Sequence, residues 1–83
     1  MDKFVGFDID NKKTIACVVQ KGRKDRFVTL PSNSEAMRKF LQQEKQDGQA
    51  VHLTFEISGE AGFLYDELIR HVDSITVSVW RQA

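Results

Sequence analysis

The stretch VHLTFEI at residues 51–57 decides the fold when it is set beside KFVGFDI at residues 3–9. In both runs an apolar side chain recurs at every second position, which is the period of a half-buried β-strand. Each run also carries an acid near its C-terminal end, Asp8 in the first and Glu56 in the second. If the two strands are parallel neighbours, these two acids meet at one end of a sheet.

Between these two runs the chain first passes through two short polar turns. The turns, at residues 10–13 and 21–25, separate strands that we expect at residues 4–9, 14–20 and 26–30. Gly22 is available for a positive φ in the second turn, and Pro31 stops the third strand. Connections of this length favour antiparallel hairpins, so the chain is expected to open with a three-stranded meander.

Two helices are expected next, each leading into a further strand. Ser32-Asn33-Ser34-Glu35 matches the S-x-x-E capping box, which predicts that Ser32 caps a helix that Asp47-Gly48 ends. A second helix is expected at residues 61–71 and a fifth strand at residues 74–80. Because helices connect the later strands, the pairings among them are expected to be parallel, with right-handed crossovers.

The order βββαβαβ predicts an α/β fold with a mixed five-stranded sheet of order 3-2-1-4-5, in which strand 2 is antiparallel to the rest. Strands 1 and 4 are then adjacent, so Asp8 and Glu56 meet at their C-terminal ends. Open α/β sheets place their sites at that end, and a carboxylate pair there can hold a divalent metal. Spacing alone leaves a plainer interpretation open, in which Asp8 ends a strand and Glu56 is a solvated strand residue.

Composition bounds the class of protein. The 83 residues make one small domain, residues 1–83, and 12 basic side chains balance 12 acidic ones. A chain with no net charge lacks the excess of basic residues that is typical of a domain that binds nucleic acid by itself. The basic cluster of the second turn is expected to be a solvated hairpin tip, with a local phosphate contact as the alternative; it consists of Lys21, Arg23, Lys24 and Arg26.

The single cysteine and the hydropathy suggest the cellular setting. Cys17 rules out an internal disulfide and lies in an apolar run, so we expect a buried structural thiol. The sequence has no signal-peptide pattern and no apolar stretch long enough to span a bilayer. A cytoplasmic protein without membrane contact is therefore expected.

Three stretches of the chain resemble the insertion-sequence 110 family of transposases, which includes the Piv-type DNA invertases. FVGFDIDNKKT at residues 4–14 resembles the family's first strand, and FEISGEAG at residues 55–62 resembles its second acidic motif. The closing RQA at residues 81–83 resembles the stretch that follows the family's fifth strand. Together the three stretches span nearly the whole sequence, in the family's order.

The resemblance implies a ribonuclease H-like, RuvC-like (Holliday-junction-resolvase-like) catalytic domain for DNA strand cleavage and transfer. In that family four acids, a DEDD set, bind two Mg²⁺ (or Mn²⁺) ions. The motifs carry the first two acids over to Asp8 and Glu56, as catalytic and metal-binding residues. The other two acids and a C-terminal helix are implied beyond Ala83, so residues 1–83 are expected to be a partial domain that is inactive alone. The implied partners are DNA, a non-coding guide (bridge) RNA and further copies of the protein as a homo-oligomer.

Two other functions and one residue role stay open. An actin-like ATPase or sugar-kinase fragment also opens with an Asp hairpin, although its phosphate-cradling Gly-Thr pair is missing from residues 10–13. A non-catalytic remnant would instead act as an assembly module through an apolar sheet face. Asp10 stands where the family often has serine; it is either an added ligand or, as turn chemistry favours, a turn residue beside Asn11.

Overall fold

A computed structural model describes residues 2–57 and 63–79 of the chain. The strands and helices in chain order are β1 (Asp2–Ile9), β2 (Lys13–Gln20), β3 (Arg26–Pro31), α1 (Ser34–Glu44), β4 (Ala50–Ile57), α2 (Phe63–Leu68) and β5 (Ser74–Val79). Short 3-10 turns, η1 (Lys45–Asp47) and η2 (Ile69–His71), follow the two helices. The expected order βββαβαβ is confirmed. Trp80 and residues 61–62, expected in the last strand and the second helix, lie outside the described residues.

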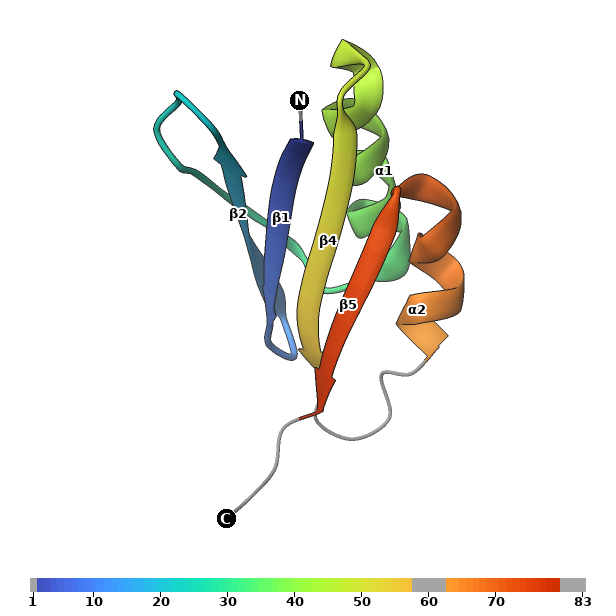
Figure 1. Cartoon of the computed structure of the whole chain (residues 1–83). Helices are drawn as coiled ribbons and strands as arrows, with labels where there is room; N and C mark the ends of the chain where they lie inside the picture. The colour runs from blue at the N-terminus through green and yellow to red at the C-terminus, as the bar shows by residue number, and fades with distance from the viewer. Residues whose placement is uncertain (1, 58–62, 80–83) are drawn as a thin grey trace.

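The strands form one five-stranded sheet of order β3-β2-β1-β4-β5. β2 pairs antiparallel with both β1 and β3, whereas β1–β4 and β4–β5 are parallel pairs. The predicted mixed sheet is therefore confirmed, and β1 lies at its centre (Figure 1). Its two neighbours are β2, which returns through a short turn, and β4, which arrives through a helical crossover.

Both helices lie against the same face of the sheet (Figure 1). The β3–α1–β4 and β4–α2–β5 crossovers move in the same direction across the sheet, so crossovers of one handedness place their helices on one side. Alternate residues of β1 and β4 face these helices and are buried, including Val5, Phe7, Leu53 and Phe55. Neither helix covers the other side, which we call the open face. It carries the remaining alternate residues of the strands, such as Phe4, Asp8, Ile15 and Glu56.

Helix α1 begins one residue later than the capping-box pattern predicts. Asn33, not Ser32, is the N-cap: its backbone is extended and its Oδ1 accepts a hydrogen bond of 2.7 Å from the Ala36 N–H. The prediction for Ser32 is wrong because its hydroxyl donates instead to the Asp10 carbonyl in the β1–β2 turn. The predicted stop is confirmed, since Gly48 follows η1 with φ of 79°.

A buried lysine fastens the centre of the sheet to the end of α1. The side chain of Lys3 is only 4% exposed, and its ammonium donates to the Glu44 carbonyl and to the Asp47 carboxylate, both at 2.7 Å. A cation is favoured there because the last carbonyls of a helix carry partial negative charge. Hydrogen bonds from the Lys3 ammonium and from the Gln49 backbone N–H hold the pKa of Asp47 below its usual value.

The open face exposes apolar side chains. Phe4, Ile15, Val19 and Phe27 are 53%, 37%, 40% and 70% exposed. Cys17 lies on β2 among them and is half-buried, so the expectation of a buried thiol is wrong. The apolar run at residues 15–19 alternates between the two faces of β2, and only Ala16 and Val18 reach the covered side. In the described part of the chain, no helix has the length and apolarity needed to cross a bilayer.

Candidate functional site

The two acids singled out from the sequence lie on the same face of two adjacent strands. Phe7 of β1 and Phe55 of β4 are register partners in the parallel ladder, and Asp8 and Glu56 are the next residues of their strands. Both rings are buried against the helices, so both carboxylates project from the open face, where they are exposed. Neighbouring strands are about 4.8 Å apart. Asp8 and Glu56 therefore lie on the same face near the C-terminal ends of adjacent strands, directly after the last paired residues of the β1–β4 ladder.

Two carboxylates in this position offer a partial ligand set for a hard cation. Mg²⁺ prefers oxygen ligands, keeps several waters and is commonly held by one or two carboxylates. Asp8 and Glu56 fit that demand for one ion. Within residues 2–57 and 63–79, no group of three or more His, Cys, Asp or Glu side chains is arranged to hold a metal. Among the described residues, Asp8 and Glu56 are therefore a pair of carboxylates that could hold one ion between them.

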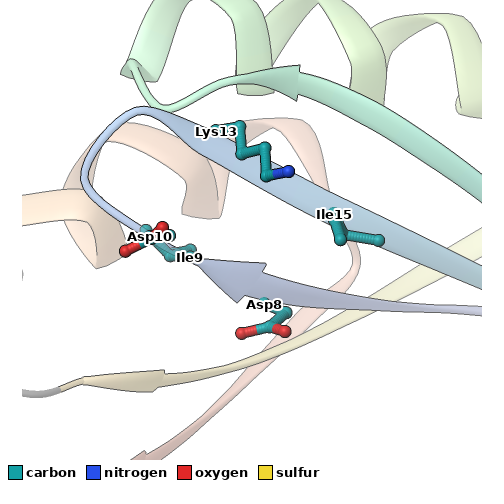
Figure 2. A pocket seen from close by; sticks show the side chains of 5 residues that line it. All are labelled: Asp8, Ile9, Asp10, Lys13 and Ile15. Carbon is teal, nitrogen blue, oxygen red and sulfur yellow. The ribbon is translucent and has the colours of Figure 1, made fainter.

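An open pocket of about 290 Å³ extends from Asp8 towards the β1–β2 turn. Its lining residues are Asp8, Ile9, Asp10, Lys13 and Ile15 (Figure 2). Glu56 is not among them, so the pocket lies on the β2 side of Asp8 while Glu56 lies on the β4 side. Asp8 thus has the Glu56 carboxylate of β4 on one side and the pocket that contains Lys13 of β2 on the other.

The β1–β2 turn, whose residues Asp10 and Lys13 line this pocket, is held in place by hydrogen bonds. The Asp10 N–H donates to the Lys13 carbonyl at 3.1 Å, which closes the turn. Ser32 fastens the turn from outside, because its hydroxyl donates to the Asp10 carbonyl and its N–H to the Lys12 carbonyl. The buried Thr14 hydroxyl completes the network at 2.8 Å from the Ser32 oxygen. The turn role expected for Asp10 is confirmed for its backbone, while its side chain lines the pocket.

His52 shares the open face with Glu56 but belongs to a separate cluster. Its Nδ1 lies 2.7 Å from the Ser74 hydroxyl and its Nε2 lies 3.3 Å from Asp2 Oδ1. Phe4 stacks on its ring with centroids 5.2 Å apart. His52 is therefore a satisfied histidine nearer the opposite end of the strands.

Two residues near the site were not identified from the sequence. The sequence pattern places Lys13 in a polar turn, whereas in the structure it is the first residue of β2, and alternation with Ile15 puts it on the open face. Ser32 fits the capping-box pattern, which predicts a helix cap. Its actual partner is Asp10, 22 residues away in the chain, and a local pattern gives no signal for such a contact.

No family model matches the sequence, and no curated protein matches it significantly. Function is therefore inferred from the positions of Asp8 and Glu56 and from the side chains around them.

Proposed function

We propose that this chain forms part of the catalytic domain of a DNA transposase or site-specific recombinase with a ribonuclease H-like, RuvC-like fold. The observation that carries the proposal is the position of Asp8 and Glu56, at the C-terminal ends of adjacent parallel strands and on the open face. The strand order β3-β2-β1-β4-β5 supports it, because that order is the ribonuclease H-like layout that the resemblance to the insertion-sequence 110 family implies.

In this proposal Asp8 and Glu56 hold a divalent cation, Mg²⁺ or Mn²⁺, with Asp8 as the central ligand. A bound cation of this kind activates the attacking oxygen and stabilises the leaving oxygen in phosphodiester cleavage. The two side chains bind and orient it, and their exposure leaves room for substrate. The resemblance implies two further aspartates elsewhere in the domain. Residues 1–83 alone are therefore expected to bind metal weakly and to lack nuclease activity.

DNA is the proposed substrate, and a non-coding guide RNA is the second proposed nucleic-acid partner. Affinity for nucleic acid comes largely from cations that neutralise phosphates. Because the 12 basic and 12 acidic residues cancel, most of the phosphate-binding surface is expected to lie in other parts of the complex. This chain would contribute carboxylates and local contacts.

A manganese titration followed by NMR tests the metal site. Mn²⁺ should broaden amide signals at the ends of β1 and β4 first, and Asp8→Asn should remove that broadening. Asp66→Asn, an exposed acid of α2, is the matched control and should leave it unchanged. Uniform broadening at all exposed acids would refute the metal site. Tight ATP binding at the β1–β2 turn would favour the actin-like ATPase or sugar-kinase alternative instead.

A second candidate function, self-association as an assembly module, is favoured by the apolar side chains of the open face. Five strands about 4.8 Å apart, each with about six residues at about 3.3 Å, make a face of roughly 500 Å². Two copies packed face to face then bury roughly 1,000 Å², where specific interfaces begin. The zero net charge adds no overall repulsion between copies. We therefore propose a second copy of this chain as the partner.

Sedimentation equilibrium tests this second candidate. The parent chain should form dimers, and Phe27→Ser should shift the equilibrium to monomer, because Phe27 is the most exposed apolar residue of the face. Tyr65→Ser is the control, since Tyr65 is 41% exposed but lies on α2. A parent chain that stays monomeric at high concentration would contradict the proposal, as would equal effects of the two substitutions.

A further inference from the structure

We propose that Lys13 binds a phosphate group of the nucleic-acid strand at the Asp8 site. This inference rests on the proposed function and adds a substrate-binding residue to it. Its basis is the pocket of about 290 Å³, in which Lys13 is the one cation among the lining residues and faces the same space as Asp8 and Asp10 (Figure 2).

Strand geometry explains how Lys13 reaches this position. In the antiparallel β1–β2 ladder Asp8 pairs with Ile15 and Ile9 with Thr14. Lys13 is the next residue along β2, beside Asp10, to which the turn hydrogen bond joins it. Because Thr14 is fully buried, alternation puts Ile15 and Lys13 on the open face with Asp8. The lysine thus stands one strand away from Asp8, on the side opposite Glu56.

The charges in the pocket suit a metal-bound phosphodiester. Two carboxylates and one ammonium line it, which leaves one net negative charge. Glu56 of the proposed metal site adds a second net negative charge, and one divalent cation then brings the total to zero, so the bound cation removes the net repulsion between the carboxylates and a phosphodiester anion. Among the described residues, Lys13 takes part in no ion pair. Its ammonium is therefore available to a phosphate oxygen, and lysine is a common phosphate ligand.

The backbone that carries Lys13 is fixed before any ligand arrives. Ser32 holds both the Asp10 and Lys12 carbonyls, and the buried Thr14 hydroxyl holds Ser32. A preorganised site loses less freedom on binding and gains affinity for that reason. Lys12 is attached to the same turn but does not line the pocket. The two adjacent lysines therefore provide a matched pair for a test.

Fluorescence anisotropy with a short labelled oligothymidylate, in the presence of Ca²⁺ as the divalent cation, tests the inference. Lys13→Gln should weaken binding roughly tenfold and reduce the slope of log affinity against log salt by about 0.7, one single-strand phosphate contact. Lys12→Gln changes the same charge one residue away and should have a clearly smaller effect. Lys13→Arg should restore most of the affinity, because the cation is retained.

Equal effects of Lys13→Gln and Lys12→Gln would overturn the inference, as would an unchanged salt slope or no oligonucleotide binding by the parent chain. Coupling to Asp8 is a further requirement: in an Asp8→Asn background, Lys13→Gln should have less effect than in the parent. If the proposed function itself is wrong, Mn²⁺ should not selectively broaden the amide signals at the ends of β1 and β4. If that broadening is present and the two lysine variants behave alike, the inference about Lys13 fails alone.

Discussion

Phe7 of β1 and Phe55 of β4 are partners in a parallel ladder, and each is followed directly by an acid. The two rings lie in the core, 5% and 2% exposed, and the ring of Phe7 packs against Phe40 of α1 with centroids 6.2 Å apart. A one-residue shift of either strand in the pairing register would turn its acid into the core and its ring outward. The hydrophobic core therefore sets the common orientation of Asp8 and Glu56.

The buried Lys3 ammonium should make a large contribution to stability. Lys3→Met keeps most of the apolar stem but removes charge-assisted hydrogen bonds to Glu44 and Asp47. We expect a loss of about 2 kcal/mol in the free energy of unfolding, measured with urea. Lys39→Met is the control, because the exposed pair between Lys39 and Glu35 should contribute about 0.5 kcal/mol or less. Equal losses in the two variants would show that the Lys3 contacts add nothing.

Stability should fall in acid because of two aspartates. The Lys3 ammonium lowers the pKa of Asp47, and the Lys45 ammonium followed by the Val51 N–H lowers that of Asp73. A carboxylate whose pKa is depressed on folding adds stability above its unfolded pKa of about 3.9, and this is lost as pH falls through the folded pKa. Urea midpoints measured from about pH 6 downwards should drop less in Asp47→Asn and Asp73→Asn than in the parent. A parent-like acid slope in both variants would contradict the assignment.

The start of α1 should depend on Asn33 and not on a capping box. Asn33→Ala removes the acceptor for the Ala36 N–H and should cost about 1 kcal/mol. Asn33→Asp keeps the acceptor and adds a favourable charge at the helix N-terminus, so it should be neutral or stabilising. Circular dichroism during urea unfolding measures both. A larger loss in Asn33→Asp than in Asn33→Ala would exclude this cap.

Ser32 should matter for the β1–β2 turn. Ser32→Ala removes the bond to the Asp10 carbonyl and leaves the buried Thr14 hydroxyl without its partner. The expected cost is roughly 1–3 kcal/mol. Amide hydrogen exchange at Asp10 should accelerate more than exchange at Val5 in the centre of β1. Protection at Asp10 that stays at the parent level would show that the turn does not need Ser32.

The fold was largely predictable because the sequence patterns that specify it are local. The elements are marked by the alternation in β1, β2 and β4, by the two polar turns, and by Gly22 and Gly48. Crossover rules then order the strands. The features that the sequence did not predict depend on contacts between segments that are distant in the chain. Ser32 fits a capping pattern, but its hydroxyl can also donate to the Asp10 carbonyl. Only the packing of the β3–α1 connection against the first turn decides which of these two roles it takes. The exposure of Cys17 likewise depends on which face the helices cover.

The candidate site was predictable in part for the same reason. Asp8 and Glu56 are each marked by a strand that ends in an acid, and strand order places them together. Lys13 carries no comparable mark, because a lysine in a polar turn is usually solvated. Its place in the same pocket as Asp8 follows from the β1–β2 register, which the turn geometry sets.

Manganese affinity in a double-mutant cycle of Asp8→Asn and Glu56→Gln, measured by calorimetry, tests the central claim most directly. If both carboxylates hold the same ion, each single variant should weaken binding at least tenfold, and the double variant should be little worse than either single one. Additive losses would mean that the two acids act independently. Unchanged affinity in both single variants would contradict a metal site shared by Asp8 and Glu56.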